Sequence, residues 1–409
     1  LILNNENATI SNITGNFIAN GLSSSNGKLI NNYGHIDNIK GTFAINKTEY
    51  GLIYNNENAT IDKIEGLFVD NVSNDYYSAA VNNSGIIKSI LADFINGSGI
   101  SNNYGVITNI VGSFINSDIV NIGGSDNNRG TITNITGDFI GSKIKNKGTI
   151  DKIEGTFANN KRGSYDYYAA IYNNSNHALI KLILADFIAN QGRGISNIYG
   201  GITDIIGSFI GNSINLIPDY YDRTAKGGAI FNADADPDTG SVSYIGNISG
   251  TFLSNHASTK DTYSYIGSAL GGAIYNTGRI DSITNSHFQN NYTEAEKGDA
   301  FGGAIYNSDY RYMDMGIGKI QNTSFIGNYA KSESGTAQGG AIWSKLDLNI
   351  VADNGESLFS GNYVQNGDKK DPQAIFVTNM IEKKNLGSSH SHDFYQNETH
   401  KTAVTLNSI

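Results

Sequence analysis

The chain has 409 residues, a formal net charge of −10 at pH 7 and no cysteine. The acidic balance and the lack of a basic stripe argue against nucleic acid as a partner, and no apolar run reaches the length of a membrane-spanning helix. Disulfides are excluded, which suits an exported bacterial protein that crosses the periplasm unfolded. The sequence begins at Leu1 inside a repeat and ends at Ile409, as we expect for a piece of a longer chain.

One pattern, Ile-x-x-Ile-x-Gly-x-Phe-x-x-Asn, organises the chain and is first seen from Ile10 to Asn20. It recurs at intervals of 18–43 residues, which indicates a repeat protein. Ten of the thirteen copies carry Asn three residues after the Phe. The phenylalanines of the thirteen copies are Phe17, Phe43, Phe68, Phe94, Phe114, Phe139, Phe157, Phe187, Phe209, Phe252, Phe288, Phe325 and Phe359.

The residues between the isoleucines are Asn, Thr, Ser, Asp and Gly, which are poor helix formers. Ile13, Gly15 and Phe17 instead alternate with polar residues, as on one face of a β-strand, and we expect a bend between Ile10 and Ile13. A second short strand precedes each copy. The sequence therefore predicts an all-β fold, a right-handed parallel β-helix (solenoid) of about 13 or more turns.

In such a coil, like residues stack on like residues in adjacent turns. We expect columns of Phe and Ile to fill the interior, with the Gly leaving room for a neighbouring ring. Asn at the turns tolerates left-handed backbone geometry and is expected to hydrogen-bond to the turns above and below.

The spacing of the repeats divides the chain into three regions. Residues 1–216 have short turns, residues 217–340 have longer polar loops and Gly-Gly-Ala-Ile repeats, and residues 341–409 form less regular C-terminal turns. A larger duplication lies within this series, because Ile61–Phe114 matches Ile150–Phe209 and both copies begin with Ile-Asp-Lys-Ile-Glu-Gly. Insertions on a rigid scaffold are common places for function.

The repeats of the C-terminal half carry Gly-Gly-Ala-Ile at Gly227, Gly271, Gly302 and Gly339, each paired with a later Phe-x-x-Asn. This pairing resembles the passenger domains of type V autotransporters and is similar to the polymorphic outer membrane protein family. The resemblance covers about residues 225–409, and the N-terminal half departs from it by lacking Gly-Gly-Ala. It implies export to the bacterial cell surface (outer membrane) or secretion, and adhesion to host or neighbouring cells. Membrane attachment would come only through a C-terminal β-barrel absent from this chain.

Tyrosines in the predicted loops are the best candidates for ligand binding, because Tyr on exposed loops offers amphipathic contact area. The alternative is that these rings cover the edge of the coil. The candidates are Tyr76, Tyr77, Tyr167, Tyr168, Tyr220, Tyr221, Tyr263, Tyr265, Tyr310 and Tyr312.

Other chemistry has weaker signals in the sequence. Asp234, Asp236 and Asp238 form the densest acidic cluster, but they lack the Gly and the distal Glu of a calcium loop, and a solvated loop is the simpler interpretation. The acidic residues beside the Ile column, such as Asp62 and Asp151, are expected to be surface charges. No nucleophile elbow is found and there is no thiol, so we predict no catalytic residue, no metal and no cofactor.

Two functions from different classes follow. The first is a cell-surface adhesin that holds binding loops on a stiff rod and contacts a host cell-surface protein or glycan, or a second copy of itself. The second is a polysaccharide lyase or glycoside hydrolase on the same scaffold, which would need a groove lined by carboxylates.

Overall fold

The fold was analysed in a computed structural model. It describes residues 2–21, 27–73, 79–124, 129–161, 169–219, 223–233, 235–236, 241–261, 265–309, 315–352, 357–378, 394–396 and 404–408. The described residues form strands and turns without a helix, which confirms an all-β fold. The chain divides into two compact units, residues 1–160 with 171–185, and residues 161–170 with 186–409.

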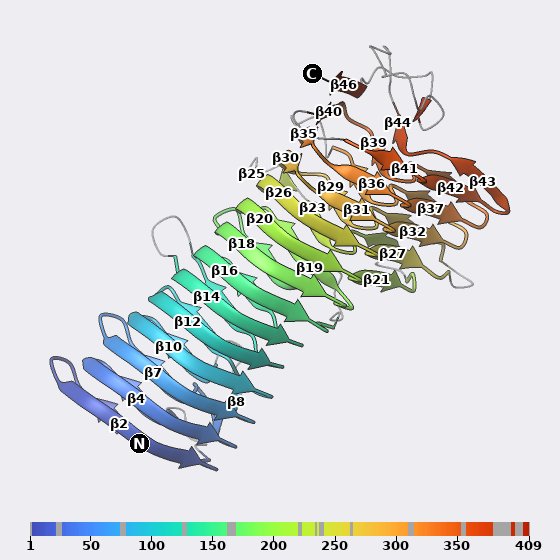
Figure 1. The fold of residues 1–409 in the computed structure, drawn as a ribbon. Helices are drawn as coiled ribbons and strands as arrows, with labels where there is room; N and C mark the ends of the chain where they lie inside the picture. Colours follow the sequence, from blue (N-terminus) through green and yellow to red (C-terminus); the bar gives the residue numbers. More distant parts are fainter. Residues whose placement is uncertain are drawn as a thin grey trace. The chain divides into compact units, whose positions relative to one another are not determined.

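The N-terminal unit is a coil of two stacked parallel sheets, and Figure 1 shows its long strands side by side in chain order. The long-strand sheet contains β2 (Thr9–Ile18), β4 (His35–Ala44), β7 (Thr60–Val69), β10 (Ile86–Ile95), β12 (Val106–Ile115), β14 (Thr131–Ile140) and β16 (Thr149–Ala158). The short-strand sheet contains β1 (Ile2–Asn4), β3 (Ile30–Asn32), β6 (Ile53–Asn55), β9 (Val81–Asn83), β11 (Ile100–Asn103), β13 (Ile119–Ile122), β15 (Ile144–Asn146) and β17 (Ala169–Asn174). The pair β5 (Lys47–Thr48) and β8 (Val72–Ser73) adds a small third sheet. Both β17 and β18 (Leu179–Ile188) have residues in both units.

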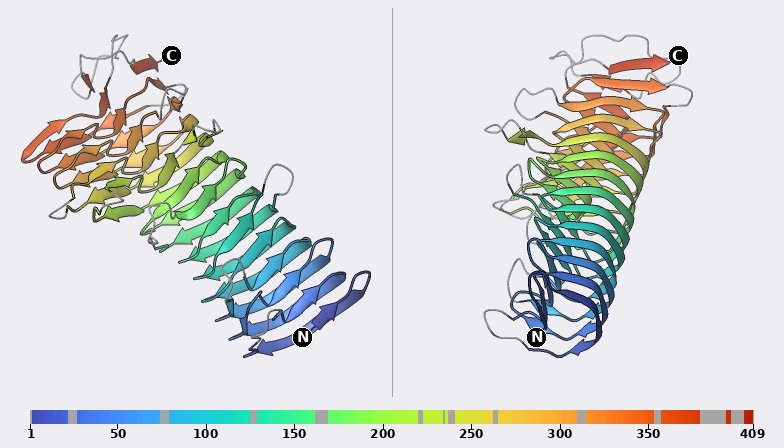
Figure 2. Two further views of the ribbon diagram at one scale, coloured as in Figure 1. Left: turned by 180° about the vertical axis from the view of Figure 1, so that it is seen from behind. Right: turned by 90° about the vertical axis from the view of Figure 1, so that its left-hand side faces the viewer.

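The C-terminal unit repeats this plan, and Figure 2 shows the stacking from two further directions. Its short-strand sheet contains β19 (Arg193–Ile198), β23 (Ile230–Ala233), β29 (Ile274–Asn276), β34 (Ile305–Asn307), β39 (Ile342–Ser344), β44 (Ile375–Val377) and β45 (Phe394–Gln396). Its long-strand sheet contains β20 (Gly201–Ile210), β26 (Tyr244–Leu253), β30 (Arg279–Thr284), β31 (His287–Gln289), β35 (Gly316–Gln321), β36 (Ser324–Ile326), β40 (Leu348–Ala352), β41 (Phe359–Ser360) and β46 (Val404–Ser408). The fold in each unit is the predicted parallel β-helix.

The register explains the repeat pattern. In the first pair of long strands, Ile10 faces Ile36, Ile13 faces Ile39 and Phe17 stacks on Phe43, with ring centroids 4.8 Å apart. The phenylalanine stack continues through each unit, and rings from Phe43 to Phe157 are fully buried. The predicted interior columns are therefore confirmed.

Two details of the repeat differ from expectation. The left-handed residue lies one position before the Asn: Ile45 has φ 55° and Asn46 follows it. The Asn itself forms the predicted hydrogen bonds to both neighbouring turns, since Asn46 Nδ2 donates to the Phe17 carbonyl at 2.8 Å and to Asn71 Oδ1 at 2.9 Å. At the Gly position, it is the backbone of the neighbouring turn that leaves no room for a side chain, and not a neighbouring ring as predicted. A Cβ on Gly41 would lie 1.8 Å from the Gly15 carbonyl oxygen.

A second asparagine column, in the short-strand sheet, is buried along each unit. Asn102 Nδ2 donates to Asn121 Oδ1, and Asn121 Nδ2 donates to Asn146 Oδ1, both at 2.9 Å. The same amides bind carbonyls at the turn, as Asn121 Nδ2 does with Gly130 and Thr149. Because buried polar groups need partners, this ladder ties the polar corner of each turn to the next.

The long strands split in two where the repeat gains a residue. Phe288 lies five residues after Ile283 instead of four, and the extra position is taken up at Asn285, which has φ 50°. Strand β30 ends at Thr284 and β31 begins at His287, so the insertion replaces one continuous strand by two. The interior column survives, since Phe288 still stacks on Phe252 at 4.4 Å.

Residues 217–340 hold more strand than the predicted polar loops suggest. A six-stranded sheet, the side sheet, contains β21 (Ser213–Leu216), β27 (His256–Thr259), β32 (Tyr292–Ala295), β37 (Tyr329–Ser332), β42 (Tyr363–Asn366) and β43 (Lys369–Pro372). A four-stranded sheet, the ledge sheet, contains β22 (Thr224–Lys226), β28 (Ser268–Leu270), β33 (Ala300–Phe301) and β38 (Ala337–Gln338). One further hairpin pairs β24 (Ala235–Asp236) with β25 (Ser241–Val242).

Candidate functional site

The outer face of the side sheet presents two parallel columns of side chains in the C-terminal unit. Each of the strands β27, β32 and β37 alternates a half-buried residue with a buried one, so its first and third residues face outward. The parallel register then aligns like positions across the sheet. The first column contains His256, Tyr292, Tyr329 and Tyr363, and the second contains Asn215, Ser258, Glu294, Lys331 and Gln365.

The first column is a continuous ring stack. His256 stacks on Tyr292 with centroids 4.6 Å apart, Tyr292 on Tyr329 at 4.9 Å, and Tyr329 on Tyr363 at 5.1 Å, with interplanar angles of 2–8°. Lys370 Nζ, from the antiparallel strand β43, lies 3.5 Å from the Tyr363 ring centroid and covers the far end. The ring faces within the stack are therefore covered, and ring edges are what the column presents.

The second column supplies polar partners to the first. Tyr329 OH donates to Glu294 Oε1 at 3.0 Å, and His256 Nε2 lies 3.0 Å from Asn215 Oδ1. Ser258 Oγ also donates to Asn215 Oδ1, at 2.6 Å. The Tyr329–Glu294 and His256–Asn215 contacts run diagonally between neighbouring strands and fix the orientation of these two rings, whereas Ser258 and Asn215 lie directly opposite each other.

Burial and charge set the protonation of this surface. Burial raises the pKa of the Tyr329 hydroxyl far above its usual value, and the Glu294 carboxylate raises it further. The pKa of Tyr292 is raised by the same two causes, whereas burial lowers the pKa of His256. At neutral pH this stack of His256, Tyr292, Tyr329 and Tyr363, called the aromatic ladder below, thus consists of uncharged rings whose phenols act as hydrogen-bond donors.

The Gly-Gly-Ala repeat positions these strands. Gly271 has φ +64°, a left-handed conformation that favours glycine. A Cβ on Gly272 would lie 2.1 Å from the Gly303 carbonyl oxygen and 2.4 Å from that of Tyr292, so only glycine lets the ladder strand approach. The following Ala273 is fully buried.

A small core of mostly alanine lies between the side sheet and the ledge sheet. Small side chains bring the two sheets close together, which makes the side sheet a fixed part of the C-terminal unit. The cluster consists of Ile214, Leu216, Ala225, Ala257, Ala269, Ala295, Ala300, Ala330, Ala337 and Val364.

Among the ten tyrosines predicted to bind a ligand, only Tyr265 lies within the described residues. It is half-buried, with the Arg223 guanidinium 5.0 Å from its ring centroid. The other nine lie outside the described residues: Tyr76, Tyr77, Tyr167, Tyr168, Tyr220, Tyr221, Tyr263, Tyr310 and Tyr312.

The four ring residues of the first column were not among the predicted site residues, although the sequence contains a signal for them. Each ladder residue directly follows the Asn of Phe-x-x-Asn, as His256 follows Asn255 and Tyr292 follows Asn291. An aromatic residue recurring at that one position predicts a stack once the parallel register is known.

The acidic residues named in the sequence analysis also lie partly inside and partly outside the described residues. Asp234 and Asp238 lie outside the described residues, and for Asp236 the structure describes only its backbone position in β24. The acidic residues of the Ile column are surface ion pairs as predicted. Lys88 Nζ lies 2.8 Å from Asp62 Oδ1, and Lys181 Nζ lies 2.8 Å from Asp151 Oδ1.

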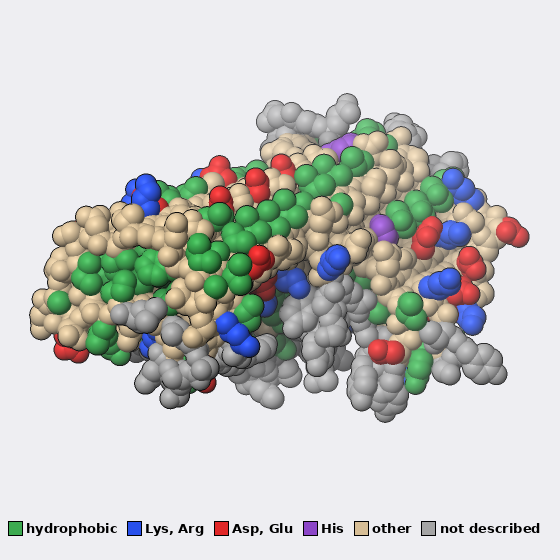
Figure 3. Space-filling model, turned by 90° about the horizontal axis from the view of Figure 1, so that it is seen from below, with side chains coloured by type: hydrophobic (Ala, Val, Ile, Leu, Met, Phe, Trp, Pro, Cys, Tyr) green, Lys and Arg blue, Asp and Glu red, His purple; other side chains and the backbone are tan. Residues whose placement is uncertain are grey.

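Hydrophobic side chains also gather in patches on the face of the molecule drawn in Figure 3. In the N-terminal unit, exposed aliphatic residues meet across two neighbouring long strands. Ile86 pairs with Val106, and Leu91 pairs with Val111; these four side chains are 37–45% exposed. Because these four side chains lie next to one another, they form a continuous apolar patch and not isolated exposed residues.

Comparisons with known proteins give no match: no protein family, no curated protein and no solved structure is similar to this chain. In the part of the chain that the structure describes, no helix is long and apolar enough to cross a membrane.

Proposed function

We propose that this chain is the binding region of a bacterial surface adhesin of the autotransporter type, and that the outer face of the side sheet is its contact surface. The observation that carries the proposal is the aromatic ladder with its polar second column. Both columns face outward on strands that the coil fixes in place. Tyrosine is enriched where proteins bind proteins, because one residue offers apolar area and a hydrogen-bonding hydroxyl.

The geometry favours a protein ligand over a glycan. Sugars commonly pack on the faces of aromatic rings, but here each inner ring face is covered by its neighbour in the stack. Ring edges, hydroxyl groups and the charges of Glu294 and Lys331 are left to contact a partner. Such a surface suits a polypeptide with mixed apolar and polar groups.

Preorganisation supports the same proposal. The ladder rings stack on one another and are tied to the second column by hydrogen bonds such as that of Tyr329 with Glu294. Their side chains therefore lose little conformational freedom when a partner binds, which reduces the entropic cost of association.

The test is binding of the 409-residue chain to target cells and to immobilised copies of itself. We expect the triple variant Tyr292→Ser, Tyr329→Ser and Tyr363→Ser to bind at least about tenfold more weakly, as for the loss of interface hot spots. The matched control is Tyr33→Ser with Tyr104→Ser, which removes two exposed tyrosines of the N-terminal unit. Circular dichroism confirms that each variant is folded.

Three outcomes would contradict the proposal. Undiminished binding by a folded triple variant would remove the ladder as the contact surface. Binding that survives protease treatment of the target cells but is lost after glycan removal would replace the protein ligand with a glycan. Depolymerisation of a polysaccharide by the purified chain would favour the enzyme hypothesis instead.

A further inference from the structure

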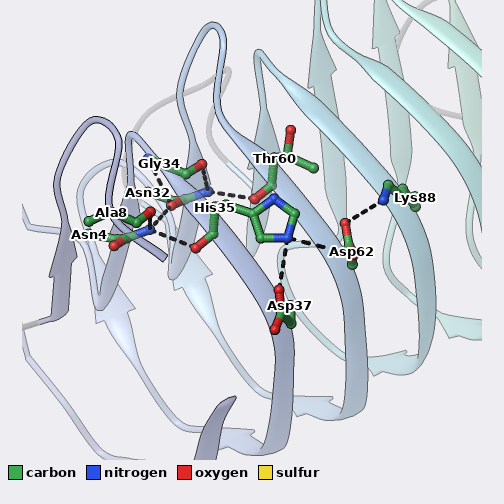
Figure 4. Close-up of polar contacts among 9 residues, drawn as sticks. All are labelled: Asn4, Ala8, Asn32, Gly34, His35, Asp37, Thr60, Asp62 and Lys88. Carbon is green, nitrogen blue, oxygen red and sulfur yellow. Dashed lines mark hydrogen bonds and ion pairs between the residues drawn. The ribbon is translucent and has the colours of Figure 1, made fainter. Parts of the chain in front are cut away.

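A histidine and two aspartates converge on the outer face of the N-terminal unit, as Figure 4 shows. His35 and Asp37 belong to β4 and Asp62 to the neighbouring strand β7. His35 Nε2 lies 2.8 Å from Asp37 Oδ1 and 3.6 Å from Asp62 Oδ2. One ligand atom from each residue lies within 4.8 Å of the others.

The two separations from His35 Nε2 are close to those around one small cation. Two ligand atoms at about 2.0–2.1 Å from a tetrahedral ion lie about 3.3 Å apart, and the observed 2.8 and 3.6 Å lie on either side of that value. An imidazole nitrogen with two carboxylate oxygens is a donor set for zinc and related transition-metal ions, whereas calcium and magnesium prefer oxygen alone. The side chains are 35–48% exposed, so a fourth position is open to water.

The backbone holds the cluster in place before any ion binds. The His35 amide donates to the Ala8 carbonyl at 2.9 Å, and the His35 carbonyl accepts from Asn4 Nδ2 at 3.0 Å. On the next turn, Asn32 Nδ2 donates to the Thr60 carbonyl at 3.0 Å. The buried asparagine ladder thus fixes the start of both strands that carry the ligands.

The internal duplication separates this cluster from an ordinary ion pair. The pair of Asp62 with Lys88 has a counterpart in Asp151 with Lys181, at the same 2.8 Å. On the strand before Asp151, however, Thr131 and Thr133 occupy the positions of His35 and Asp37. The carboxylate–lysine pair is therefore a feature of the repeat, and the His–Asp pair is an addition at one place only among these two copies.

We propose that His35, Asp37 and Asp62 form a surface site for a divalent transition-metal ion of the zinc type. His35 Nε2 binds in its unprotonated form, and one oxygen from each carboxylate completes three protein ligands. Lys88 holds the other oxygen of Asp62 and competes with the ion by its positive charge. The site does not depend on the adhesin proposal, since it lies on another unit of the chain.

Isothermal titration of the metal-free 409-residue chain with Zn²⁺, and Co²⁺ absorption spectra, test the site. We expect one equivalent to bind, and His35→Ala and Asp62→Asn each to weaken binding by at least about tenfold. Lys88→Met should tighten binding, because it removes a competing cation. Asp151→Asn, at the duplicated ion pair, is the matched control and should leave the affinity unchanged.

Thermal unfolding curves identify any variant that fails to fold. Absence of Zn²⁺ binding to the folded wild-type chain would overturn the proposal. It would also be overturned if His35→Ala and Asp62→Asn bound Zn²⁺ as tightly as the wild type, or if Asp151→Asn abolished the binding.

Discussion

The backbone conformation of a single residue in this protein depends on its position in the turn. The corner after each Phe has one residue with positive φ. Ala19, Ile45, Asn96 and Gly211 occupy this position, with φ between 51° and 63°. Left-handed geometry costs a non-glycine residue about 1–2 kcal/mol. The hydrogen bonds of the next residue offset this cost, as Asn46 illustrates with its bond to Phe17.

The buried ladder asparagines should be far more sensitive to substitution than exposed polar residues. Replacing Asn121 by Leu leaves the Gly130 and Thr149 carbonyls and the flanking amides without their partner. Because each buried unsatisfied group costs about 1–3 kcal/mol, we expect a loss of at least about 3 kcal/mol in the free energy of unfolding. Urea denaturation measures it, and exposed Thr108→Ala on β12 is the control. Equal stabilities of the two variants would contradict the role of the ladder.

The short strands of the ledge sheet support the side sheet in the C-terminal unit. The sequence did not predict them. The strands of the ledge sheet have two or three residues, too few to show a period of two. Their buried residues are mainly alanines, which carry little hydrophobic signal. Tertiary packing against the side sheet, not local propensity, makes them strands.

The contact of Gly272 with the ladder strand gives a test at this scale. In Gly272→Ala the new Cβ meets two backbone carbonyls, of Gly303 and Tyr292, that belong to the coil and cannot rotate away. Overpacking of this kind costs about 1–3 kcal/mol. We expect lower thermal stability and a changed near-ultraviolet signal from the stacked tyrosines. Ser258→Ala, on the outer face of the same sheet, should leave that signal intact; an unchanged signal in Gly272→Ala would refute the packing account.

The tyrosine stack should also give the C-terminal unit a dependence on alkaline pH. The folded state raises the pKa of Tyr329 above the ordinary 10.0, so the unfolded chain ionises first. The stabilisation is fully present below about pH 10 and is lost as the pH rises further. Denaturation at pH 8 to 11 should show a steeper loss for the wild type than for Tyr329→Phe, which keeps the ring and lacks the proton. Parallel curves would show that Tyr329 does not contribute.

For the whole molecule, the fold was predictable and the proximity of side chains was not. The Ile and Phe columns follow from the repeat itself, because a fixed spacing of Ile36, Ile39 and Phe43 can be satisfied only by stacking turns. His35 and Asp62 are distant in sequence, and only the register that pairs Ile36 with Ile61 brings them together. A site made of residues from two turns thus depends on the register between their strands, and a motif within one turn carries no information about that register.

The asparagine ladder has a direction. In the N-terminal unit the amides from Asn4 to Asn146 each donate to the next turn toward the C-terminus, and the last of these bonds reaches Asn173. In the C-terminal unit the series runs from Asn197 to Asn307 and ends on the Ser344 hydroxyl. Aligned hydrogen bonds polarise one another, so each added turn strengthens the bonds already made. The two ends of such a coil are therefore not equivalent. A further turn stacks well only if its asparagine amide points in the same direction as those of the turns already in place.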